Sequence, residues 1–250
     1  MVEGLNSFKE KFKNYTDCYT VIGGAACEIL MTDVAATFRE TRDIDMILIV
    51  EDKFTEFAKL FWQYIKDGGY RYGWKSSPEM HFYRFTEPKP GFPVQIELFS
   101  KNPEHKFGDN AGIIPVHIED DVSSLSAILL DDNYYNLMME GRRIVSDIPV
   151  LDSAYLMIFK MYAFLNLDAS KKRGEFVKER DYKKHKYDVF RLMQIVDKNK
   201  RIELVPEIKD MIISFCDFMD NENIPYRNLG IEVGDKETDL AAIRKIFSIN

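Results

Sequence analysis

The sequence predicts an α+β fold, with a strand-containing α/β domain over residues 1–140 and a mainly helical domain over residues 141–250. Two observations predict this division. Short runs rich in β-branched and aromatic residues, which are typical of strands, are concentrated in the first part. Apolar residues at helical spacing dominate the second part. The sheet of the first domain is expected to be mixed or antiparallel.

The composition is that of a folded protein from a reducing compartment. The chain has 250 residues, of which 46% are hydrophobic and 30% charged, and its 18 Phe and 13 Tyr supply a sizeable core. This excludes disordered and fibrous proteins. Cys18, Cys27 and Cys216 are far apart, which favours buried thiols over disulfides or a zinc site. The N-terminus does not resemble a signal peptide, and no apolar run approaches the ~18 residues of a membrane span. We therefore expect a cytoplasmic protein without a membrane partner.

The elements of the first domain follow from periodicity and from helix or strand breakers. Apolar spacing predicts a helix over residues 3–15, and a β-branched run predicts a strand over 19–22. Gly23 and Gly24 end that strand, and helix formers follow over 25–31. The later elements are expected to be a strand over 43–50, a helix over 54–65 with a glycine stop at 68–69, a hairpin of strands over 80–85 and 94–99, and a short strand over 113–118.

The second part of the chain changes to helical spacing. A short strand over residues 142–150 is the exception. The expected helices cover 125–140, 152–167 with Asp152 as N-cap, 182–199, 207–219 and 239–247.

Carboxylates recur in the apolar strands of the first domain. Asp43 and Asp45 are two residues apart on one strand, so both side chains share one face. Hard oxygen ligands on a rigid strand suit Mg²⁺. Taken alone, however, two such acids are more often a solvated strand end. Glu97 interrupts the apolar run 94–99 and is either on a solvated face or a ligand. Adjacent strands carrying all three acids would hold two Mg²⁺ ions against a triphosphate, which is the arrangement for in-line displacement at phosphorus.

The glycine pair is the second candidate feature. Backbone N–H groups at a helix N-terminus attract phosphate, and glycine allows a ligand to approach closely. A lone Gly-Gly is most often a tight turn. Here Gly23 and Gly24 precede the acidic strand by one helix and one loop, which favours a nucleotide site.

Together these residues resemble a known family. Val-Ile-Gly-Gly-Ala at 21–25, followed by Arg-Glu-Thr-Arg-Asp-Ile-Asp at 39–45, is similar to the DNA polymerase β-like nucleotidyltransferase superfamily, and most similar to its AbiEii-type abortive-infection branch. The resemblance covers residues 19–192. It implies a nucleotidyltransferase domain over residues 1–140 with a two-metal Mg²⁺ site. The implied metal ligands are Asp43, Asp45 and Glu97, and the implied nucleotide-binding residues are Gly23, Gly24, Arg39, Thr41 and Lys184. Arg39 and Thr41 have an alternative role, which is to cap or brace the strand.

Two segments of the helical part extend the resemblance. Lys160, in the run 156–163, matches a lysine that the family carries on a helix, and residues 184–192 match a later motif. The resemblance implies that Lys160 neutralises triphosphate charge and that Asp188 orients Lys160 or contacts the nucleotide. The alternative for Lys160 is a snorkelling surface lysine. His185 is a departure, because the family usually has Asp at that position.

The resemblance implies an enzyme that uses an NTP as substrate. It transfers NMP to an acceptor hydroxyl and releases pyrophosphate, with Glu97 also able to act as the base. Members of this branch are toxins, so a cognate antitoxin protein is an expected partner. A non-catalytic nucleotide-binding regulatory module on the same fold is the first alternative. An unrelated α/β protein that carries the motifs by chance is the second.

The charge distribution bears on the acceptor. The net charge of −7 excludes a broad nucleic-acid coat. Residues 168–191, however, hold nine Lys/Arg against five Asp/Glu. A solvated helix face accounts for this basic window. An RNA acceptor, such as a tRNA end, accounts for it as well, because phosphate contacts dominate the affinity of proteins for RNA. We favour the RNA end over a protein hydroxyl.

Overall fold

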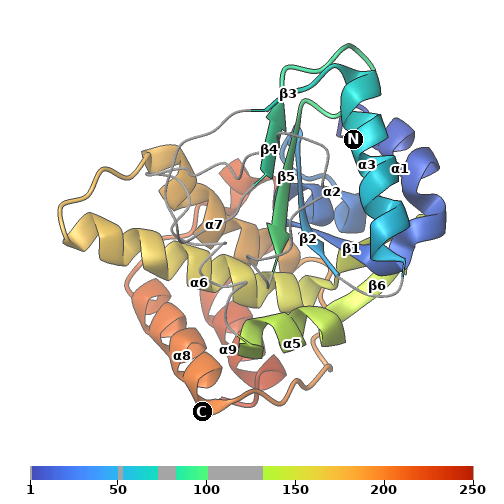
Figure 1. Ribbon diagram of the computed structural model, residues 1–250. Helices are drawn as coiled ribbons and strands as arrows, with labels where there is room; N and C mark the ends of the chain where they lie inside the picture. Colours follow the sequence, from blue (N-terminus) through green and yellow to red (C-terminus); the bar gives the residue numbers. More distant parts are fainter. Residues whose placement is uncertain (1, 50–52, 73–82, 101–131, 250) are drawn as a thin grey trace. The chain divides into compact units, whose positions relative to one another are not determined.

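The computed structural model describes residues 2–49, 53–72, 83–100 and 132–249 (Figure 1). These residues separate into two compact units, one ending at Asp152 and one beginning at Ser153. The first unit contains a mixed sheet with helices and the second is helical, which confirms the predicted α+β class. The predicted division after residue 140 stays a prediction. The hairpin that follows residue 140 joins the sheet of the first unit.

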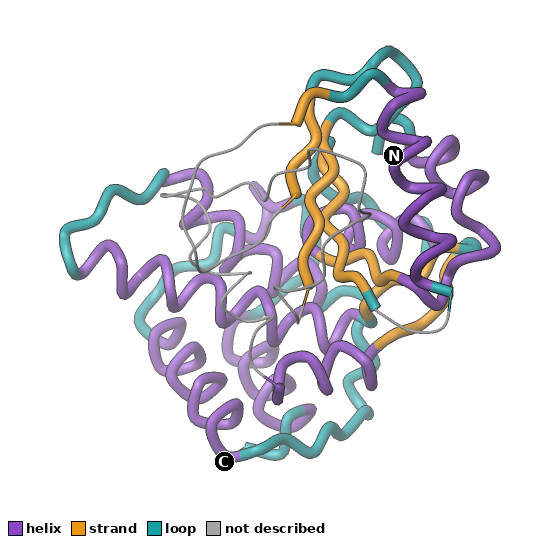
Figure 2. Tube along the Cα trace, in the orientation of Figure 1, coloured by secondary structure: helices purple, strands orange, loops and turns teal. Residues whose placement is uncertain are grey.

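The sheet in the described part of the first unit has seven strands in the order β3-β4-β5-β2-β1-β7-β6. Strands are drawn in orange in Figure 2. Two pairs of neighbours, β2 with β5 and β1 with β7, are parallel, and the other pairs are antiparallel. The strands are β1 (Tyr19–Ile22), β2 (Asp43–Leu48), β3 (Arg71–Tyr72), β4 (Tyr83–Thr86), β5 (Gln95–Ser100), β6 (Arg142–Val145) and β7 (Ile148–Leu151). The predicted pairing of the strands near 80–85 and 94–99 is confirmed by β4 and β5.

Aromatic side chains attach two helices of the first unit to the sheet. The helical elements are α1 (Leu5–Phe12), the 3₁₀ segment η1 (Lys13–Cys18), α2 (Gly23–Asp33), α3 (Phe54–Gly68) and α5 (Asp132–Gly141). Phe12 of α1 lies 5.5 Å, between ring centroids, from Phe57 of α3, and Phe57 stacks on Tyr19 of β1. Gly69 ends α3 in the left-handed conformation, which confirms the predicted glycine stop.

The second unit is built around one long helix. It contains α6 (Ser153–Lys172), α7 (Glu179–Leu192), α8 (Pro206–Asp220), the 3₁₀ segment η2 (Tyr226–Leu229) and α9 (Lys236–Ile246). Phe164 of α6 contacts the rings of Tyr182 on α7 and of Phe215 and Phe218 on α8. No helix in the described residues has both the length and the apolar character that crossing a membrane requires.

The structure differs from the sequence expectations at several elements. Residues 142–150 form two strands instead of one, because Ser146 and Asp147 adopt φ angles of 49° and 62° and turn the chain in a tight hairpin. Strand β3 was not predicted. The helix expected over 182–199 begins earlier and ends at Leu192. The strand expected over 113–118 lies outside the described residues.

Candidate active site

The turn between β1 and α2 fits only glycine. Gly23 is buried and has a φ of 68°, a conformation that L side chains rarely adopt. A Cβ atom at Gly23 would collide with the carboxylate of Asp45. A Cβ atom at Gly24 would lie 2.7 Å from the hydroxyl oxygen of Thr41 and 3.5 Å from Nη2 of Arg39. Close neighbours therefore favour glycine at both positions, and the backbone conformation favours it at Gly23 as well.

The sheet explains why these residues meet. Strands β1 and β2 are antiparallel, with Ile22 opposite Asp45, so the end of β1 lies beside the start of β2. The segment before β2 returns past the first turn of α2 and brings Arg39 and Thr41 to Gly24. Five of the sequence-predicted residues thus surround one helix N-terminus. They are Gly23, Gly24, Arg39, Thr41 and Asp45.

The predicted acids line one face of neighbouring strands. Asp45 of β2 is the direct register partner of Glu97 of β5, and Asp43 is the partner of Gln95. Neighbouring strands lie about 4.8 Å apart, and register partners point to the same face. Ile44 and Met46 are buried on the opposite face. Asp43, Asp45 and Glu97 therefore share a face, as the sequence predicts.

Glu97 has two neighbours that sequence reasoning did not identify as part of the site. Nε of Arg84, on β4, donates to Oε1 of Glu97, and Nε2 of Gln95 donates to the same oxygen at 3.0 Å. Arg84 is the register partner of Glu97 in the antiparallel β4–β5 pair. The alternation of side chains along the two predicted hairpin strands indicates which residues share a face and could pair across the strands. The register across the turn at 87–94 could not be read from the sequence.

The carboxylate oxygens of the three acids suit Mg²⁺ that binds together with a nucleotide. In the described residues, no three or more His, Cys, Asp or Glu side chains are grouped closely enough to hold a metal ion. Asp45 and Glu97 are nevertheless register partners, with Asp43 two residues before Asp45. Mg²⁺ is usually bound by one or two carboxylates plus substrate phosphates, and not by a closed protein cage. The site therefore offers hard oxygen ligands that a triphosphate would complete.

The second unit brings together the two residues that the resemblance links. Nζ of Lys160 on α6 donates to Oδ2 of Asp188 on α7 at 2.9 Å, and the two side chains are 4% and 0% exposed. Nη1 of Arg191 lies 3.1 Å from the other oxygen of Asp188. Lys160 is therefore not a snorkelling surface lysine. His185 is also buried, and Lys184 pairs with Asp181 at 2.8 Å.

Most cations of the basic window have acidic partners. In the described residues, at least seven of the nine Lys/Arg side chains over 168–191 form ion pairs with a carboxylate. The pairs are Lys171–Glu179, Lys172–Asp168, Arg173–Glu175, Lys183–Glu179, Lys184–Asp181, Lys186–Glu222 and Arg191–Asp188. Lys171, Lys172 and Arg173 remain more than half exposed. The basic window is therefore a surface of mixed charge, on which these three cations are exposed to solvent.

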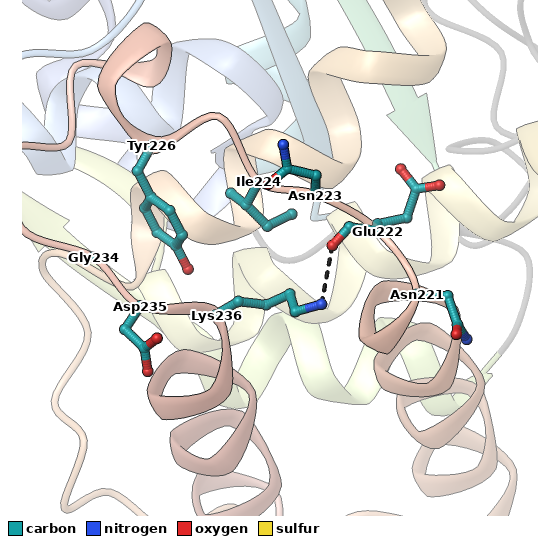
Figure 3. Close-up of a pocket in the computed structure, with 8 residues that line it drawn as sticks. All are labelled: Asn221, Glu222, Asn223, Ile224, Tyr226, Gly234, Asp235 and Lys236. Atoms are coloured by element: carbon teal, nitrogen blue, oxygen red, sulfur yellow. Dashed lines mark hydrogen bonds between the residues drawn. The ribbon is translucent and has the colours of Figure 1, made fainter.

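A pocket of about 410 Å³ lies in the second unit, and none of the predicted site residues lines it (Figure 3). Several of its polar groups bond within the protein. Nζ of Lys236 donates to the carbonyl oxygens of Asp220 at 2.6 Å and Glu222 at 3.1 Å. Burial raises the pKa of Tyr226 above its ordinary range, and the Tyr226 hydroxyl donates to Asp239 at 2.9 Å. These bonds join α8 to α9, so the pocket is a structural junction.

Gly23→Ala is expected to abolish any binding at the β1–α2 turn and to destabilise the first unit. The new methyl group meets the Asp45 carboxylate in a backbone conformation that costs alanine about 1–2 kcal/mol. Thermal unfolding and nucleotide titration measure the two effects. Gly174→Ala is the matched control, since Gly174 also has a positive φ but has open space around its Cβ position. If Gly23→Ala behaves like this control, the close packing of Gly23 against Asp45 has no functional importance.

No protein-family model matches the chain, and no curated protein matches its sequence. Several solved structures are similar to it, among them the following three. An antigenic nucleotidyltransferase-like protein from Paracoccidioides brasiliensis has 12% identity and a TM-score of 0.46, over 94% of this chain and 89% of that one. The antibiotic-resistance factor ANT(2'')-Ia has 9% identity and a TM-score of 0.35, over 81% and 84%. JHP933 from Helicobacter pylori has 10% identity and a TM-score of 0.38, over 96% and 88%. At such low identity, the function has to be inferred from the residues of the site.

Proposed function

We propose that the protein is a metal-dependent nucleotidyltransferase that transfers NMP from an NTP to an acceptor hydroxyl. One observation carries this proposal: Arg39, Thr41 and Asp45 converge on the Gly23-Gly24 turn at the N-terminus of α2. A helix N-terminus offers backbone N–H donors and a positive partial charge. A guanidinium and a hydroxyl beside it add donors for phosphate oxygens. A carboxylate beside it would repel a bound phosphate unless a cation lies between the two.

The three acids on the shared face of β2 and β5 supply the second half of the site. In this proposal Asp43, Asp45 and Glu97 would hold Mg²⁺, which would supply neutralisation of the triphosphate charge when bound. The acceptor oxygen forms a bond to the α-phosphorus while the bond from that phosphorus to the bridging oxygen breaks. Pyrophosphate leaves, and Glu97 takes the acceptor proton. Roles for Lys160, Asp188 and Lys184 in this reaction remain predictions from the family resemblance.

The acceptor that we propose is an RNA end, such as a tRNA end. The support is the exposed group of Lys171, Lys172 and Arg173 at the end of α6. Exposed ion pairs contribute little to stability, so these cations can exchange their carboxylate partners for phosphates. The family resemblance also suggests a toxin with a cognate antitoxin protein as its partner.

A non-catalytic nucleotide-binding module is the second candidate. It is favoured by the pairing of Glu97 with Arg84 and by the lack, in the described ranges, of a metal cluster with three ligands. Such a module binds an NTP at the glycine turn without turnover. Binding without pyrophosphate release therefore separates it from the enzyme.

Incubation with each α-³²P-labelled NTP, Mg²⁺ and total RNA tests the proposed reaction. We expect label in RNA, an equal amount of released pyrophosphate, and loss of both on chelation of the metal. Reversal of Lys171, Lys172 and Arg173 to Glu should weaken RNA binding and reduce its dependence on salt, while NTP binding is unchanged. Label on the protein itself or on another protein would contradict the RNA acceptor. Absence of pyrophosphate release with every NTP and acceptor would contradict the enzyme.

A further inference from the structure

The carboxylate of Glu97 has two chemically different ends. Its Oε1 accepts hydrogen bonds from Nε of Arg84 and Nε2 of Gln95. Its Oε2 accepts no hydrogen bond from the residues that the structure describes. The Glu97 side chain is 17% exposed, so most of its surface contacts protein and not solvent.

The donors reach Glu97 from two places on the sheet. Arg84 lies directly across from Glu97 on β4, and Gln95 precedes Glu97 by two residues on the same face of β5. On the other side of Glu97, its register partner is Asp45 of β2. Arg84, Glu97 and Asp45 therefore form one row across three adjacent strands, with the cation at one end and the second acid at the other.

We infer that Arg84 and Gln95 are positioning residues that hold Oε1 of Glu97 and so present its Oε2 to a divalent cation shared with Asp45. This inference rests on the proposed function. A glutamate side chain has three rotatable bonds, and two hydrogen bonds to one of its oxygens remove most of its rotational freedom. Carboxylates that bind metals are commonly held in this way by hydrogen bonds, and loss of such a partner typically weakens metal affinity 10–100-fold. The Arg84 guanidinium also offsets the repulsion between neighbouring acids before a cation binds.

The test is a titration of the 250-residue chain with Mn²⁺ alone, monitored through the electron paramagnetic resonance signal of free Mn²⁺. We expect Arg84→Gln and Gln95→Leu each to raise the Kd for Mn²⁺ by about 10–100-fold. Arg84→Lys retains the charge and one donor, so its Kd should lie between those of Arg84→Gln and the wild type. Arg71→Gln is the matched control, because Arg71 on β3 pairs with an exposed acid, Glu87, at 2.8 Å. Its Mn²⁺ affinity should equal that of the wild type.

Two results overturn the inference while leaving the proposed function intact. One is an unchanged Kd in Arg84→Gln and Gln95→Leu. The other is tighter binding in Arg84→Gln, which would mean that Arg84 competes with the metal. If neither the wild type nor any variant binds Mn²⁺, first alone and then with a non-hydrolysable NTP analogue that supplies phosphate oxygens, the inference fails together with the assigned metal ligands. Pyrophosphate release that still depends on a metal would then show that the reaction itself survives. Circular dichroism of each variant separates these outcomes from misfolding, and Arg84→Lys provides the comparison if Arg84→Gln does not fold.

Discussion

Asp43→Asn is expected to lower NMP transfer by about 10³-fold or more while the melting temperature holds or rises. Loss of a metal ligand removes several kcal/mol of charge stabilisation from the transition state, and each 1.36 kcal/mol is a tenfold change in rate. Asp43 lies two residues from Asp45 on a shared face and opposite Gln95 on β5. Replacing one of several neighbouring carboxylates with a neutral amide reduces repulsion in the metal-free protein. Pyrophosphate release and thermal unfolding measure the two effects.

Asp33→Asn is the matched control for this variant. Asp33 is an exposed residue at the end of α2, the helix whose other end forms the candidate site. The control should retain full activity and an unchanged melting temperature. If Asp43→Asn instead unfolds at a much lower temperature and nucleotide binding survives, the acids have a structural role and the metal assignment is wrong.

Local sequence patterns predicted the elements that carry the candidate site residues, because each of these elements is short. The strand over 19–22, the glycine turn and the start of β2 at Asp43 all appear in the structure as the sequence suggests. Gly23 and Gly24 indicate a turn whose backbone conformation favours glycine. The alternation of side chains along a strand places Asp43 and Asp45 on one face. The convergence of Arg39 and Thr41 on Gly24 followed from the resemblance, not from spacing.

Features that depend on long-range register could not be predicted in the same way. The pairing of Arg84 with Glu97 depends on which residues of β4 and β5 face each other, and a shift by one residue would place Arg84 on the opposite face. The hairpin at Ser146 and Asp147 was missed because this pair is a weaker turn signal than Asn-Gly or Asp-Gly. The sequence placed Lys160 among apolar residues, but its burial depends on how α7 packs on α6.

The buried pair of Lys160 and Asp188 gives the second large expected effect, which is on stability. Removing one member of a buried pair leaves an uncompensated charge and typically costs about 3–5 kcal/mol. We expect Asp188→Asn to reach this range, because it leaves both Lys160 and Arg191 without the carboxylate. Lys160→Met should cost less, since Arg191 still neutralises Asp188. The double variant should lose less than the sum of the two, because the side chains are in contact.

Urea denaturation of the four proteins in this cycle measures the coupling between Lys160 and Asp188. The exposed pair Lys183–Glu179, at 53% and 57% exposure, is the matched control and should show a coupling below about 1 kcal/mol. Strictly additive losses for Lys160 and Asp188 would contradict the buried ion pair. The same variants also test the predicted catalytic role. If Lys160 only supports the fold, kcat/KM of folded Lys160→Met should equal the wild-type value, whereas a lysine that neutralises the leaving pyrophosphate should lower kcat/KM at every temperature at which the variant is folded.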